Sequence, residues 1–238
     1  MNNTENLFIE SLNAFKKVAL KNIEKNSSSK DDKFYKIAIK LAYKDAQFRT
    51  IKGHKSDNKE GIINKIADVF EESIKYNESN ITLIEKVEKI LQNDLKGEGK
   101  KQSFGKAQKI VNMGFKYLYC LNKSDPDAKF DKRDIPLDKN ILEFYYRAKL
   151  NNKNDKKITS WSRITKDQYL QIQDNLKQYI KDLGFDMNPI EAEFIIWNYA
   201  TSNSIVSTYK SAKKNYDKLK KDNKPSYECY ELIAGILK

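Results

Sequence analysis

Apolar side chains recur every three or four residues along nearly the whole chain, which is the spacing of one face of an α-helix. Strict alternation of apolar and polar residues, the pattern of a half-buried strand, is hard to find anywhere. The 238 residues include only eight Gly and four Pro, too few for a turn-dense β-barrel or sandwich. The sequence therefore predicts an all-α protein, and we expect a single helical unit over residues 1–238.

The helical pattern divides into segments that are separated by polar or glycine-bearing stretches. Polar stretches at 26–32, 122–134 and 151–157 are expected to be linkers or loops. Helices are expected at about 5–25, 33–51, 61–76, 79–95, 103–121, 135–149, 165–183 and from 189 onward, with one or two more in the last forty residues.

Composition excludes several classes of protein. With 39% hydrophobic residues, the chain is too apolar for wholesale disorder. No window approaches the roughly 20 apolar residues of a membrane span, and residues 1–10 lack the pattern of a secretory signal. Two distant cysteines, Cys120 and Cys229, make neither a disulfide framework nor a metal knuckle. We expect a reduced, soluble, cytoplasmic protein with no membrane partner.

The net charge of +12 points to a polyanionic partner such as nucleic acid. A merely basic protein is the alternative, because only four of the 45 basic residues are arginine. The chain is also crowded with Asn, Ile and Tyr, a profile that an A·T-rich coding sequence produces.

The segment 103–121 follows a short glycine-bearing turn and shows two different faces on a helical wheel. One broad side is apolar, and the other carries Lys106, Lys109 and Lys116. A helix–turn–helix unit with a lysine face fits docking against a phosphate backbone, with Lys100 and Lys101 in the turn. The alternative is an ordinary surface helix of a lysine-rich protein.

Two later helix starts carry further candidate residues. Asp138 follows Pro136 in the first turn of a helix, where a carboxylate either caps free backbone N–H groups or performs chemistry. Residues 188–191 (NPIE) predict a cap, a proline at the first helical position and a capping-box Glu. The same helix carries Glu193 and Trp197 on one face, and Trp197 is alternatively a core residue.

Most catalytic arrangements are absent from the sequence. His54 is the only histidine, and nothing around it suggests a catalytic triad, so we expect it at the surface. The chain has no phosphate-binding glycine loop, no dinucleotide fingerprint and no Cys/His cluster with metal-ligand spacing. If the protein is an enzyme, a lysine nucleophile is the leading remaining option.

Several short motifs carry a resemblance to a known superfamily. In order and approximate spacing, the chain resembles the helix-hairpin-helix DNA glycosylases, most closely the archaeal 8-oxoguanine DNA glycosylase branch. The resemblance covers about residues 34–200, with the hairpin and catalytic helix at about 80–122. The matching segments are 41–47 (LAYKDAQ), 80–90 (NITLIEKVEKI), 108–117 (QKIVNMGFKY), 135–142 (IPLDKNIL) and 188–197 (NPIEAEFIIW).

The resemblance implies a helix-hairpin-helix glycosylase-like fold with two helical lobes around a central cleft. It implies that Lys109 is the nucleophile and that Asp138 assists it. It further implies that Gln47 reads the flipped base and that Glu193 and Trp197 hold it. Glu193 departs from the pattern, which has Asp there, and its longer side chain would reshape base recognition. The turn at 96–105 also differs from the usual hairpin sequence.

The function implied is a DNA glycosylase with AP lyase activity that excises an oxidised purine, 8-oxoguanine first. The enzyme flips the base out of the duplex, which costs free energy. Contacts with DNA phosphates would offset that cost, and the lysines expected to make them are Lys106, Lys116, Lys100 and Lys101. Neutral Lys109 would attack the sugar and form an imine, with no metal or organic cofactor. We expect a monomer that acts on damaged duplex, or on single-stranded, DNA. The alternatives are a glycosylase for another modified base and a non-catalytic helical nucleic-acid-binding protein.

Overall fold

The computed structural model describes residues 3–24, 34–47, 59–94, 103–122, 126–151, 158, 160–184 and 187–205. Within these ranges the chain forms helices and no strand, which confirms the all-α prediction. The α-helices are α1 (Asn3–Glu24), α2 (Phe34–Gln47), α3 (Lys59–Lys75), α4 (Asn80–Asp94), α5 (Ser103–Leu121), α6 (Lys139–Arg147), α7 (Lys166–Asp182) and α8 (Pro189–Ile205). Two 3-10 helices, η3 (Phe130–Lys132) and η4 (Trp161–Arg163), complete the described elements.

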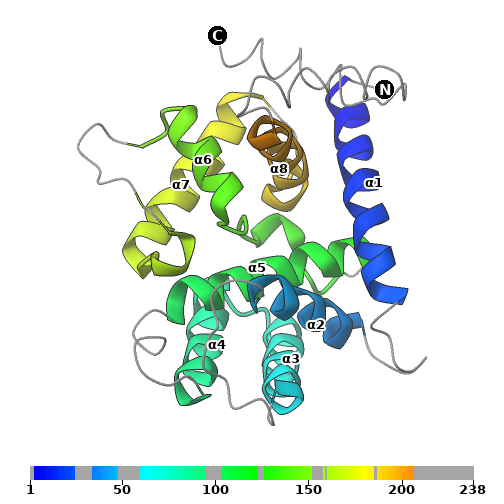
Figure 1. Ribbon diagram of the computed structural model, residues 1–238, viewed down its shortest axis with the longest axis vertical. Coiled ribbons are helices and arrows are strands. Elements are labelled where there is room, and N and C mark those ends of the chain that lie inside the picture. Colours follow the sequence, from blue (N-terminus) through cyan, green and yellow to red (C-terminus); the bar gives the residue numbers. More distant parts are fainter. Residues whose placement is uncertain are drawn as a thin grey trace.

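Helix α5 lies at the centre of the molecule (Figure 1). Helices α2 and α4 pack along it and α3 packs on both of them, while α6, α7 and α8 lie on its other side. Helix α1 runs along α8 and reaches the ends of α2 and α5. Neighbours on every side bury sixteen of the nineteen residues of α5. The glycosylase-like arrangement of two lobes around a cleft stays a prediction.

The burial of α5 contradicts one expectation from the sequence. Its lysine side was expected to face solvent, yet Lys106, Met113 and Lys116 are buried. A helical wheel separates polar from apolar positions, but it does not show which other helices cover the polar side. For Lys116 that cover comes from Glu193 of α8 and Phe15 of α1.

Helix starts follow the caps that the sequence predicts. At α8 the Glu191 N–H donates to Asn188 Oδ1 (3.0 Å), and the Asn188 N–H donates to Glu191 Oε2 (3.1 Å). This reciprocal pair is the predicted capping box, and it confirms the helix start at Pro189. Thr165 and Gln168 form the same motif at the start of α7.

Helix α6 begins later than predicted. Its first residue is Lys139, whereas the sequence pattern predicts a start at Ile135. Pro136 sterically disfavours the helical conformation of the residue before it, so Ile135 continues the irregular segment and Asp138 becomes the cap. The 3-10 helices η3 and η4 were not predicted. The helices expected after 205 lie outside the described residues, as does His54.

No helix in the described ranges is both long enough and apolar enough to cross a membrane.

Candidate functional site

Lys109 is the one residue between Ser103 and Tyr119 that is not buried. Its Nζ lies 4.5 Å from the centroid of the Trp161 ring, so the ammonium group rests on the indole face. Gly105, one turn earlier, allows this contact. A Cβ at Gly105 would lie 2.5 Å from the Trp161 carbonyl oxygen, so only glycine lets η4 approach α5 this closely. Trp161 is partly buried and also packs on the core.

Lys116 lies two turns beyond Lys109 on the same side of α5, and it is fully buried. Its Nζ lies 2.5 Å from Glu193 Oε2, with the side chains 0% and 1% exposed. Three aromatic rings surround the ammonium group, with centroids 4.1–4.9 Å from Nζ: Phe15 from α1, and Phe194 and Trp197 from α8. The predicted contact between Lys116 and DNA phosphate is therefore wrong for this structure, because a buried ion pair holds the side chain inside.

Glu193 has an unusual environment for a carboxylate. Burial raises its pKa to about 7, and the negative charge of Asp138 acts in the same direction. The charge of Lys116 and its hydrogen bond oppose that rise. The Oε1 atom of Glu193 is buried and has no hydrogen-bond partner among the described residues. The site thus holds a buried acceptor oxygen that can take a hydrogen bond from a ligand N–H group.

Asp138 caps α6 through one of its two carboxylate oxygens. Oδ1 accepts hydrogen bonds from the backbone N–H groups of Asn140 (2.8 Å) and Ile141 (3.0 Å). These bonds confirm the capping interpretation. They leave Oδ2 without a hydrogen bond to any residue that the structure describes, so capping does not prevent this carboxylate from taking part in chemistry.

Asp45 is a neighbour of the site that was not among the predicted residues. Tyr117 donates its hydroxyl proton to Asp45 Oδ2 at 2.5 Å. Desolvation by the surrounding protein raises the pKa of this partly exposed carboxyl, while the Tyr117 hydrogen bond and the charges of Lys109 and Lys116 lower it. Asp45 lies in the segment 41–47, which carries part of the resemblance. Its place in that segment is the sequence feature that could have identified it as a site residue.

Electrostatic effects relate several of the predicted residues to one another. The charges of Lys109 and Lys116 both act on Asp45, and those of Lys116 and Asp138 both act on Glu193. Trp197 joins the group through its contact with Lys116. Direct contacts thus join Lys116, Glu193 and Trp197, whereas Lys109 and Asp138 are related to this group only through the electrostatic effects on Asp45 and Glu193.

The remaining predicted residues fall outside this group. Lys106 is only 4% exposed, and burial lowers its pKa, so its expected contact with DNA phosphate is also wrong for this structure. Gln47 ends α2, but its side chain lies outside the described residues, as do Lys100 and Lys101. Phe70 packs in the core with its ring 4.6 Å from that of Phe115.

The described residues contain no group of three or more His, Cys, Asp or Glu side chains arranged to hold a metal ion. No protein-family model matches the chain, and no curated protein or solved structure matches it either. The assignment of a function therefore depends on the geometry around α5.

Proposed function

We propose that this protein is a DNA glycosylase with AP lyase activity that removes an oxidised purine, with 8-oxoguanine as the first candidate. The observation that carries the proposal is the partial exposure of Lys109 within the otherwise buried segment 103–119 of α5. A lysine that is kept at the surface of a central helix, beside a gathered set of charged and aromatic groups, has the position of a nucleophile.

In the proposed reaction the neutral Lys109 amine bonds to C1′ of the flipped nucleotide. The bond from C1′ to the base breaks, and its electron pair leaves with the base, which takes up a proton. The proton lost by the lysine passes to the Asp138 carboxylate. The nitrogen lone pair then breaks the bond from C1′ to O4′, O4′ takes up the proton from Asp138, and an iminium ion results. Removal of a C2′ proton finally expels the 3′ phosphate.

In this proposal the buried ion pair of Lys116 and Glu193 belongs to the base-binding site, and Lys116 is no longer assigned a contact with DNA phosphate. The unpartnered Oε1 of Glu193 accepts a hydrogen bond from a purine N–H group, and Trp197 packs against the ring. Both charged groups are covered in the resting structure, and Phe15 lies over Lys116. A base therefore reaches Glu193 only when the side chains that cover the ion pair move aside.

Borohydride trapping on a duplex that contains 8-oxoguanine tests the proposal. Hydride reduces the iminium to a stable amine, so the enzyme becomes covalently attached to DNA. We expect the wild type to be trapped and Lys109→Gln not to be trapped. Lys139→Gln is the matched control, because it removes an equal charge next to Asp138 from a side chain that is 75% exposed. Absence of trapping by the wild type on lesion and abasic DNA would refute the proposal.

A second candidate is a non-catalytic DNA- or RNA-binding protein, which the net charge of +12 favours. Such a protein binds oligonucleotides in a salt-dependent way but is never trapped on them. A third candidate is a glycosylase for another modified base, which Glu193 favours because it stands where the resembled family has Asp. A panel of duplexes, each with one modified base, separates this candidate from an 8-oxoguanine enzyme.

A further inference from the structure

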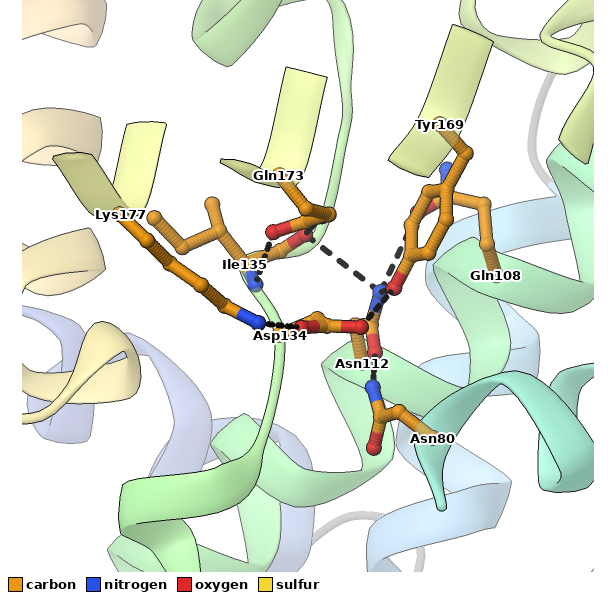
Figure 2. A network of polar contacts seen from close by, with 8 residues as sticks. All are labelled: Asn80, Gln108, Asn112, Asp134, Ile135, Tyr169, Gln173 and Lys177. Atoms are coloured by element: carbon orange, nitrogen blue, oxygen red, sulfur yellow. Dashed lines mark hydrogen bonds and ion pairs between the residues drawn. The ribbon is translucent and has the colours of Figure 1, made fainter. Parts of the chain in front are cut away.

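The segment from Asp134 to Leu137 is irregular and buried, and two glutamine side chains form hydrogen bonds with its backbone. Gln108 of α5 donates from Nε2 to the Leu137 carbonyl (2.8 Å) and accepts at Oε1 from the Leu137 N–H (3.1 Å). Gln173 of α7 forms the same pair of bonds with Ile135, at 2.7 and 3.1 Å (Figure 2). Each amide thus satisfies both backbone groups of one residue.

A buried polar network holds the start of the same segment, as Figure 2 shows. Asp134 accepts a hydrogen bond from the Tyr169 hydroxyl (2.7 Å) and forms an ion pair with Lys177 (2.5 Å). Asn112, one turn after Gln108, donates to the same hydroxyl (2.9 Å) and accepts from Asn80 of α4 (2.5 Å). The segment is therefore fixed to α4, α5 and α7 by hydrogen bonds, which are more directional than apolar packing.

The pair between Gln108 and Leu137 has a particular position in the chain. Gln108 directly precedes Lys109, and Leu137 directly precedes Asp138. The two hydrogen bonds therefore connect the side chain of the residue before the proposed nucleophile to the backbone of the residue before its proposed partner. Gln108 is fully buried and lies outside the chemistry itself.

We propose that Gln108 is a positioning residue that sets Asp138 relative to Lys109, an inference that rests on the proposed glycosylase function. A displacement of about 1 Å between reacting groups can cost about a hundredfold in rate. Without the amide, the Leu137 backbone loses its two partners and the segment is free to shift. Asp138 can then move relative to the amine whose proton it accepts in the proposed reaction, although both residues remain present.

Gln108→Met and Gln173→Met form a matched pair for the test. Each variant removes one amide together with its two hydrogen bonds to the backbone of one buried residue, and keeps a side chain of similar length. The Ile135 carbonyl keeps a longer hydrogen bond from Asn112 Nδ2 (3.4 Å) in Gln173→Met. We expect similar losses of stability in urea unfolding. At a temperature where both are folded, we expect Gln108→Met to lower the single-turnover excision rate about ten- to hundredfold, with DNA affinity unchanged. Gln173→Met is expected to lower that rate much less.

A double-mutant cycle with Asp138→Asn decides whether Gln108 acts through Asp138. If it does, Gln108→Met has little further effect on excision once Asp138 is replaced. Should Gln108→Met fail to fold, Gln108→Glu takes its place, because it keeps the acceptor for the Leu137 N–H. Equal rates for Gln108→Met and Gln173→Met, or an undiminished effect in the Asp138→Asn background, overturn the inference and leave the glycosylase function standing. A wild type that is not trapped at all refutes the proposed function, and the role of Gln108 falls with it.

Discussion

The stability of this protein should depend on the protonation of Glu193 in a direction opposite to that of most carboxylates. Its pKa is about 7 in the folded state, against an ordinary value of 4.5. Between these values the folded state binds more protons than the unfolded state, so the free energy of unfolding falls as the pH rises. Since each unit of pKa difference is worth about 1.36 kcal/mol, this carboxyl should remove about 3 kcal/mol between pH 4.5 and 7.

Urea unfolding of the wild type and of Glu193→Gln, followed by circular dichroism at several pH values, measures this effect. Gln resembles the protonated side chain but does not titrate, so the difference between the two proteins isolates Glu193. We expect the two stabilities to be similar below pH 4.5, and the wild type to become the less stable protein as the pH approaches 7. A difference that is independent of pH, or that favours the wild type at higher pH, would contradict the reasoning.

Lys116→Met extends the same experiment to the partner of Glu193. The ammonium group of Lys116 lowers the pKa of Glu193, so its removal should raise that pKa further and move the loss of stability to higher pH. Removal of one member of a buried ion pair typically costs about 3–5 kcal/mol, and we expect this loss where Glu193 is ionised. A loss below about 1 kcal/mol would mean that water reaches the pair.

Three further predictions concern the surrounding structure. Gly105→Ala places a Cβ 2.5 Å from a carbonyl oxygen of the 161–162 backbone, and should cost about 1–3 kcal/mol in urea unfolding. Asp138→Asn keeps a side chain that caps helices well, so its melting temperature should stay near that of the wild type, whereas Asp138→Ala should lose about 1 kcal/mol. Tyr169→Phe removes the hydroxyl that donates to Asp134, and should cost about 1–3 kcal/mol in the same unfolding assay.

The helices and their caps could be predicted from the sequence because both are local. The periodic segments predict helix positions within a few residues of those observed, and residues 188–191 alone indicate where α8 begins. The later start of α6 was also open to prediction, since Pro136 restricts Ile135. The 3-10 helix at 161–163 has no comparable signal, because its place depends on the close approach at Gly105.

The candidate site was only partly predictable, because its chemistry depends on contacts between distant parts of the chain. Lys109 and Lys116 carry the same charge and fall on the same side of a helical wheel, yet Lys116 is buried and Lys109 is not. The difference comes from Glu193 on α8 and Phe15 on α1, which cover Lys116. No property of the 103–121 segment alone reveals that cover.

The buried polar groups of α5 are costly in comparison with apolar side chains of similar size. A buried ion pair can often be replaced by apolar residues with no loss of stability, so stability alone does not account for Lys116 and Glu193. These polar groups make specific contacts. Gln108 and Asn112 form hydrogen bonds with the segment that leads to Asp138, and Lys116 forms an ion pair with Glu193 of α8. Lys109 emerges between these two sets of contacts. This coincidence, more than the net charge of the chain, is the reason for assigning the proposed chemistry to α5.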